Sequence, residues 1–305
     1  MRAGRVVSRQ QTSQSVWRGI REEEKTYFEY LIENQPLLHE PLGVLIDGDA
    51  LPPGYVGKQT DPHGSSAHIQ WGRVLRHVAQ TVNFHQSERD VVEASLVSTL
   101  EGALKISAPY HLSRRKRHAV LFKPFRETYV QKVLFRRISN SSDPEKSWKL
   151  VAVSVGMGGT EKSDVEIDLL RLRGMDDVGY QIQSPLLQMY SLNGTGQAAP
   201  LLATEHQAEV EVRIRSQEME QNMVVLRSAA GDDEVIRTQL QYLADRPEGA
   251  GYFQTYCGRC TTGNEPKLQS LVVESVSRSS LFDTGAPVQT SYWVFPVKIQ
   301  ETSGM

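Results

Sequence analysis

The chain of 305 residues carries a formal net charge of −2, with 39% hydrophobic and 23% charged residues. This composition excludes an intrinsically disordered chain, and no apolar run approaches the ~18 residues that a membrane-spanning helix needs. Cys257 and Cys260 are the only cysteines, too few for the disulfide framework of a small secreted domain. A cytoplasmic or other reducing intracellular location is therefore expected, and nuclear, organellar and virion locations stay open.

Residues 1–21 form a basic N-terminal arm. The arm contains no acidic residue and has five arginines: Arg2, Arg5, Arg9, Arg18 and Arg21. Organelle transit peptides share this composition, whereas a secretory signal would need an apolar stretch that is absent here. We interpret the segment as a retained arm.

Residues 22–108 are expected to be helical, with one interruption. Apolar residues recur at helical spacing through 16–31, again from 66 to 84, and again from 87 to 104, which predicts three amphipathic helices. Pro and Gly are dense over 36–64, so this part is predicted to be a loop with one short strand over 43–46.

Residues 109–305 are expected to form a β-rich body. Strict alternation of apolar and charged residues over 209–215 is typical of an antiparallel strand with one face in water. One helix is predicted over 232–243, because acidic residues at its start suit the positive end of a helix dipole. Further strands are predicted over these segments: 130–135, 149–155, 165–172, 223–227, 268–276 and 293–299.

These patterns predict an α+β protein. A helical N-terminal third would be followed by a mainly antiparallel β-sandwich or barrel-like body, because the helices come first and the short strands follow. The boundary is expected near residue 108.

A basic segment between His111 and Arg137 is the most distinctive feature of the sequence. One acidic residue, Glu127, offsets nine cations, so the segment carries +8 while the rest of the chain carries −10. A basic strip on an acidic chain is typical of proteins that bind an anionic partner. Its cations are Arg114, Arg115, Lys116, Arg117, Lys123, Arg126, Lys132, Arg136 and Arg137.

The basic segment admits two interpretations. Its cations could contact phosphates while the interleaved aromatic residues stack on bases, which predicts binding to single-stranded nucleic acid; an anionic membrane would attract the same cations. Alternatively, the aromatic residues point into the core and the cations pair with the acidic remainder or with a neighbouring subunit. The aromatic residues concerned are Phe122, Phe125, Tyr129 and Phe135.

Asp47 and Asp49 are the best enzymatic candidates. They follow an apolar stretch, and paired carboxylates at such a position hold magnesium in many nucleases and phosphohydrolases. The alternative is a solvent-exposed turn, because Asp caps its own backbone in turns and Pro and Gly follow directly.

Two further motifs are incomplete. Residues 156–163 approach a phosphate-binding loop, but Glu161 stands where that loop needs glycine, so a Gly-rich hairpin turn is predicted instead. Cys257 and Cys260 have the spacing of a redox pair or half a zinc site, yet no second cysteine pair exists. Structural thiols are expected there.

The preferred hypothesis is a non-enzymatic structural protein that works without a cofactor. It would self-associate into a homo-oligomer and bind a polyanion through the basic segment. Nucleic acid, including RNA, is the first candidate for this polyanion. Viral capsid, matrix and nucleoprotein subunits share this general make-up, which is an analogy of architecture. The alternatives are a magnesium-dependent nuclease or phosphohydrolase and a peripheral membrane coat or matrix protein.

Overall fold

The protein is mainly β. The computed structural model describes residues 19–47, 55–60, 66–108, 119–173, 179–194, 196–203, 207–229, 235–261 and 267–300. Only 14% of these residues are helical, and the N-terminal third is not helical. The prediction of an α+β protein with a helical N-terminal third is therefore wrong.

The helices are few and short. They are α1 (Glu22–Glu33), η1 (Pro36–Leu38), α2 (Glu40–Leu45), α3 (Pro144–Ser147), η2 (Pro185–Leu187) and α4 (Arg278–Phe282).

Strands make up most of the structure. They are β1 (Tyr55–Thr60), β2 (Ser66–Glu88), β3 (Val91–Ala108), β4 (Ala119–Arg137), β5 (Trp148–Ser154), β6 (Gly156–Thr160), β7 (Val165–Arg173), β8 (Gly179–Ile182), β9 (Met189–Ser191), β10 (Leu201–Ala203), β11 (Gln207–Ser216), β12 (Met223–Ala229), β13 (Val235–Gln239), β14 (Gln241–Glu248), β15 (Gly251–Thr261), β16 (Leu268–Val276) and β17 (Thr290–Gln300).

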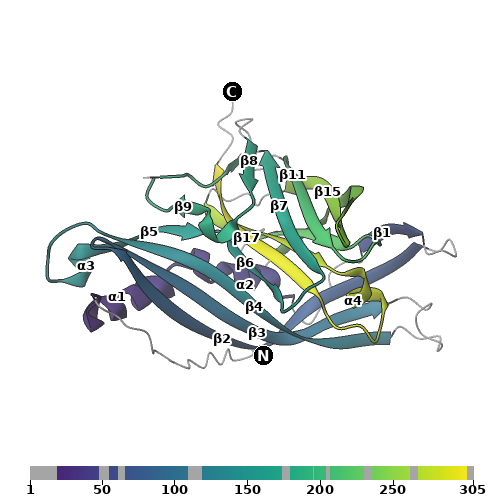
Figure 1. Cartoon of the computed structure of the whole chain (residues 1–305), viewed down its shortest axis with the longest axis horizontal. Helices are drawn as coiled ribbons and strands as arrows, with labels where there is room; N and C mark the ends of the chain where they lie inside the picture. Colours follow the sequence, from purple (N-terminus) through teal and green to yellow (C-terminus); the bar gives the residue numbers. More distant parts are fainter. Residues whose placement is uncertain are drawn as a thin grey trace.

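These strands form two sheets (Figure 1). The larger has twelve strands, with the main order β1-β2-β3-β4-β6-β17-β16-β12-β13, and β5, β9 and β10 attached beside it. The smaller has five strands in the order β14-β15-β11-β7-β8. The described pairings are antiparallel except for short β10, which runs parallel to β17.

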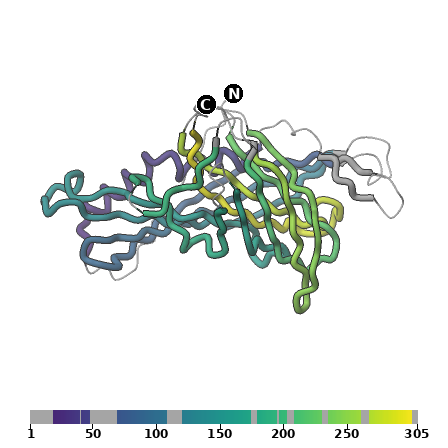
Figure 2. Tube along the Cα trace, turned by 90° about the horizontal axis from the view of Figure 1, so that it is seen from above, coloured from purple at the N-terminus to yellow at the C-terminus, as the bar shows by residue number. Residues whose placement is uncertain are grey.

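The five-stranded sheet packs on one face of the large sheet and encloses a core with it. Val212 and Ile214 of β11 contribute from one side, and Leu226 of β12 and Phe295 of β17 contribute from the other. Leu240 joins β13 at the edge of the large sheet to β14 at the edge of the small one. Figure 2 shows the β14–β15 hairpin extending from the body beside this corner.

Helices α1 and α2 cover the opposite face of the large sheet. Phe28 of α1 stacks on Phe135 of β4, with ring centroids 4.5 Å apart, and meets Trp148 edge-on at 5.2 Å. Leu42 and Leu45 of α2 belong to a second cluster with strand residues of this face. The protein therefore has three layers, with the large sheet in the middle.

The helices predicted over 66–84 and 87–104 are the long strands β2 and β3, so both predictions are wrong. In β3 the apolar residues that suggested helix are four apart, and a separation of four also keeps side chains on one face of a strand. In β2 a register shift between Leu75 and His77 brings Leu75 and Val78, three apart, to the same face. In β3, for example, Val92, Leu96 and Leu100 are all buried, while the intervening odd-numbered positions are partly exposed. The stiff Val and Thr side chains of these segments favour strands.

Other predictions have mixed outcomes. The strands predicted in the second half are confirmed as parts of β4, β5, β7, β11, β12, β16 and β17. The short strand predicted over 43–46 overlaps helix α2, and the helix predicted over 232–243 is replaced by β13 and β14 where the chain is described. The strands that flank the expected boundary at residue 108, β3 and β4, are neighbours in one sheet.

Gly102 provides a test of the β2–β3–β4 packing. A Cβ atom added there would lie 2.3 Å from the carbonyl oxygen of Val74 and 2.8 Å from Cζ of Phe125. We expect Gly102→Ala to lower the free energy of unfolding by about 1–3 kcal/mol, measured by urea denaturation, because strands and core must shift. Gly43→Ala in α2 is the control: its Cβ would meet no atom within 4 Å, and it should raise stability by up to ~1 kcal/mol. Equal effects of the two substitutions would contradict the packing.

Candidate functional site

Six charged side chains form a network at the side of the large sheet that faces the helices. Arg73 of β2 donates from Nε to Glu274 Oε1 and from Nη1 to Glu127 Oε2, both at 2.5 Å. Arg227 of β12 donates from Nε to the other oxygen of Glu274 at 2.8 Å. These four side chains are buried, and an isolated buried charge would be very unfavourable, so the pairing is essential.

Asp47 completes the network at the end of α2. Its Oδ2 accepts from the backbone N–H of Arg73 at 2.7 Å, and its Oδ1 lies 3.2 Å from Nη1 of Arg227 and of Arg237. The Arg237 guanidinium also lies 4.7 Å from the Trp71 ring centroid. Three arginines thus face three carboxylates, and the charges balance.

The network bears directly on the magnesium hypothesis. Both oxygens of Asp47 are engaged by the backbone and by two guanidinium groups, so this carboxylate faces cations of the protein itself. Asp49 lies outside the described residues. Within the described part of the chain, no group of three or more His, Cys, Asp or Glu residues could hold a metal ion.

The network also perturbs ionisation. Burial alone would raise the pKa of Glu274, but Arg227, Arg73 and Arg237 outweigh burial and lower it from 4.5 to about 2. Burial would lower the pKa of Arg73, but Glu127 and Glu274 raise it above its ordinary value. Arg73 and Glu274 are therefore held in their charged forms by their partners.

We expect Glu274→Gln to lower the free energy of unfolding at pH 7 by about 3–5 kcal/mol, because two buried guanidinium groups lose their shared anion. Since the pKa of Glu274 is depressed in the folded state, the wild type should lose this contribution as pH falls from about 4.5 to about 2. The variant should lose less stability across that range. Denaturation curves at several pH values measure both effects.

The exposed pair of Glu101 and Arg126 offers a matched control, with 3.6 Å between its charged atoms. Glu101→Gln should change the free energy of unfolding by less than ~1 kcal/mol, because surface ion pairs contribute little. An equally small effect of Glu274→Gln would show that the buried network does not stabilise the fold.

Strand alternation divides the basic segment between two faces of β4. Lys123 points toward the helix side, where Nζ donates to the carbonyl oxygens of Ser280 and Asp283 at 2.8 Å each. Burial lowers the pKa of Lys123. Arg137, on the same face, lies 3.2 Å from Glu24 and 4.7 Å from the Trp148 ring centroid. Each of these two cations therefore connects β4 to another element of the fold.

Three cations of the basic segment lie on the other face of β4. Lys132 is 2.8 Å from Glu93 and Arg126 is 3.6 Å from Glu101, whereas Arg136 is exposed. The remaining cations, Arg114, Arg115, Lys116 and Arg117, lie outside the described residues.

The aromatic residues of the basic segment are divided in the same way. Phe125, Tyr129 and Phe135 are buried in the core. Phe122 is 51% exposed, so it alone of the four is available to stack on a base. The period of two along the strand would have separated these residues in advance, had the segment been assigned to one continuous strand.

The exposed face of β2, β3 and β4 is named the ledge here. Its central residues stand in cross-strand register and are exposed or partly exposed: Ala79, Thr81, Val97, Thr99, Thr128 and Val130. Val130 pairs with Met157, which packs against the core between the two sheets. The ledge is therefore the part of this face that the five-stranded sheet leaves uncovered.

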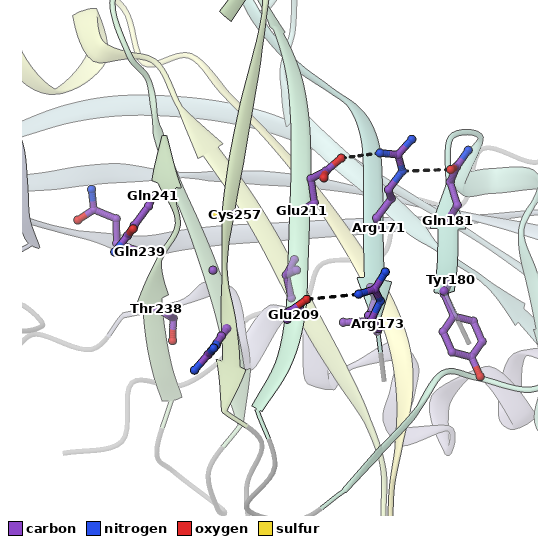
Figure 3. A pocket seen from close by; sticks show the side chains of 15 residues that line it. Arg171, Arg173, Tyr180, Gln181, Glu209, Glu211, Thr238, Gln239, Gln241 and Cys257 are labelled. Atoms are coloured by element: carbon purple, nitrogen blue, oxygen red, sulfur yellow. Dashed lines mark hydrogen bonds and ion pairs between the residues drawn. The ribbon is translucent and has the colours of Figure 1, made fainter. Parts of the chain in front are cut away.

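The outer face of the five-stranded sheet carries a second charged surface, the arginine face (Figure 3). A cavity of about 890 Å³ lies on it, lined by residues of β7, β8, β11, β13, β14 and β15. Arg171 is held between Glu211, at 2.7 Å, and Gln181, at 3.2 Å. The six arginines of this face are Arg171, Arg173, Arg213, Arg215, Arg246 and Arg259.

The arginine face was not predicted. The alternation over 209–215 correctly indicated a charged face in water, but the arginines beside it come from β7, β14 and β15. Strand order cannot be inferred from alternation, so the sequence offered no signal that these residues meet.

The cysteine pair and the Gly-rich segment, the two incomplete motifs, both lie in strands. Cys257 and Cys260 are three residues apart on β15, so they point to opposite faces of a strand, which is unsuitable for a redox pair. Cys257 lines the cavity, and burial raises the pKa of Cys260 to about 12. The Gly-rich segment is strand β6 followed by a turn at Lys162 (φ 57°) that leads into β7 of the other sheet.

Comparison of the chain with protein-family models, curated proteins and solved structures gives no significant match. Within the described residues, no helix is long and apolar enough to span a membrane.

Proposed function

We propose that the chain is a non-enzymatic structural protein that self-associates and binds a polyanion, with nucleic acid as the first candidate. The observation that carries this proposal is the division of β4 into two faces. Lys123 and Arg137 make contacts within the fold, whereas Arg126, Lys132 and Arg136 lie on the outer face of β4, which is part of the ledge. An intracellular location and a homo-oligomeric state belong to the same proposal.

The polyanion would bind at the end of the β3–β4 hairpin. Ala108 pairs with Ala119, so the connection between them contains Arg114 to Arg117 and departs from the last pair of two long strands. Val120 and Phe122 follow and are 46% and 51% exposed. Consecutive cations that shortly precede an exposed aromatic residue in the sequence suit a phosphate backbone with accessible bases.

The ledge would bind a second copy of the chain. Its charged pairs, Glu101 with Arg126 and Glu93 with Lys132, combine opposite signs on neighbouring strands. In a two-fold interface the same patch must match itself. A patch of mixed sign can meet this condition, because each acid can face a cation of the other copy, whereas a uniformly basic patch would repel itself.

A peripheral membrane role is the competing function. The exposed Val120 and Phe122 favour it, because apolar side chains beside cations can enter the headgroup region of an anionic bilayer. The magnesium-dependent nuclease receives no support from the contacts of Asp47.

Replacement of Arg114, Arg115, Lys116 and Arg117 by Ala should weaken binding to single-stranded RNA at low salt. Each lost phosphate contact reduces the salt dependence by ~0.7, so the slope of log affinity against log salt should fall by up to ~3. Fluorescence anisotropy across a salt series measures both quantities. Arg89→Ala, Lys146→Ala and Lys149→Ala, made together, form the control, because these cations are exposed elsewhere.

An unchanged slope in the four-residue variant would rule out the basic segment as the polyanion site. Parallel flotation with vesicles containing phosphatidylserine separates the two partners. If the variant loses vesicle binding while the wild type fails to bind RNA, the membrane role replaces the nucleic-acid role.

Thr99→Arg should dissociate the oligomer. Thr99 lies at the centre of the ledge opposite Thr128, so a new cation there would repel its counterpart across a two-fold interface. Mass measured by light scattering should fall to that of the monomer, with the thermal unfolding midpoint little changed. Thr26→Arg on α1 is the matched control, because Thr26 is exposed on the helix layer. A wild type that is already monomeric at high concentration would refute the proposal.

A further inference from the structure

The arginine face has an ordered arrangement of charge. Arg173, Glu209 and Arg259 lie side by side in register on β7, β11 and β15, so one carboxylate stands between two guanidinium groups. The Arg173–Glu209 distance is 3.9 Å, and both side chains are more than 60% exposed. This loose pair leaves guanidinium donors available to a further anion.

The contacts in the next cross-strand row are shorter. Arg171 is fixed by Glu211 and by Gln181 (Figure 3). A guanidinium that is already oriented loses less entropy when it binds a ligand. Gln239, Gln241 and Cys257 line the same cavity on the other side.

The face continues beyond the cavity toward the β14–β15 hairpin. There the Phe253 ring has three guanidinium groups within 5.6 Å of its centroid, from Arg213, Arg215 and Arg246. Successive rows along β11 are ~7 Å apart, since each spans two residues of an antiparallel strand. Arginine therefore recurs along the whole face, and the five strands contain no lysine.

We propose that the cavity on the arginine face binds a segment of single-stranded nucleic acid. This rests on the proposed polyanion role and adds a site separate from the basic segment. Arg173 and Arg259 contact phosphates, and the planes of these exposed guanidinium groups offer surfaces for base stacking. Glu209, Glu211 and the glutamines suit the mixed donors and acceptors of bases, because carboxylates accept from exocyclic amino groups.

The chemistry and size of the cavity distinguish this ligand from others. A volume of about 890 Å³ lies in the range of sites that enclose organic ligands. The site is concave and its lining carries both signs of charge, which fits a narrow chain with phosphates and amino groups. A flat anionic bilayer would meet the glutamates as well as the arginines and could not follow the concave surface.

The test measures binding of a fluorescently labelled twelve-residue oligouridylate and a mixed-sequence oligomer of the same length. Arg173→Gln with Arg259→Gln should lower affinity at low salt about tenfold and reduce the salt slope by roughly 1.4. Arg89→Gln with Lys146→Gln is the matched control with two exposed cations removed. Retained thermal unfolding midpoints verify the fold.

A second variant adds charge without removing a native ion pair. Gln239→Glu with Gln241→Glu keeps side-chain size and places two carboxylates in the cavity, so it should also weaken binding. Gln217→Glu, an exposed position outside the cavity lining, should have little effect. If the arginine variant fails to fold, this glutamate pair decides the question alone.

The outcomes separate the two proposals. If the wild type binds no oligonucleotide, the proposed polyanion role fails, and the cavity proposal fails with it. If the wild type binds and both cavity variants bind equally well, only the cavity proposal is overturned. The cavity proposal is also overturned if the cavity variants lose binding to phosphatidylserine vesicles but still bind the oligonucleotide, because the partner of the cavity would then be a membrane.

Discussion

The buried charge network is the interaction on which the rest of the structure depends. Arg73, Glu127, Arg227 and Glu274 come from four strands, β2, β4, β12 and β16, and Asp47 joins them from the end of α2. Because a buried charge without its partner is strongly unfavourable, any other register of these strands would carry the cost of unpaired charges. The pairing of three arginines with three carboxylates explains why one face of the large sheet can hold these six side chains.

The three-layer arrangement determines which surfaces remain for binding. Helices α1 and α2 cover one face of the large sheet, and the five-stranded sheet covers part of the other. The ledge stays uncovered where the long strands β2, β3 and β4 pass beyond the five-stranded sheet, and the arginine face lies on the outside of that sheet. Self-association is proposed for the ledge, and polyanion binding is proposed for the segment from Arg114 to Arg117 and for the arginine face.

The assignment of a segment to helix or strand was most secure where one periodicity was unambiguous. Strand β11 was identified because Val210, Val212 and Ile214 alternate with charged residues, a period that no helix shares. Strand β3 was mistaken for a helix because its leucines are four apart, a spacing that fits both structures. Of the candidate site residues, Lys123 and Arg137 make contacts inside the fold, since the face to which a strand residue points decides what its side chain meets.

The sequence by itself determined composition, charge balance and several strands, because these depend on residues that are neighbours along the chain. The sequence shows that the segment from His111 to Arg137 carries a charge of +8, and it excludes a complete phosphate-binding loop. Only the tertiary structure decided which charges meet: Arg73 and Glu274 are 201 residues apart in sequence, and their side chains are 2.5 Å apart in the fold. The arginine face likewise exists only after β7, β11, β14 and β15 pair, because cross-strand neighbours are set by sheet order and register.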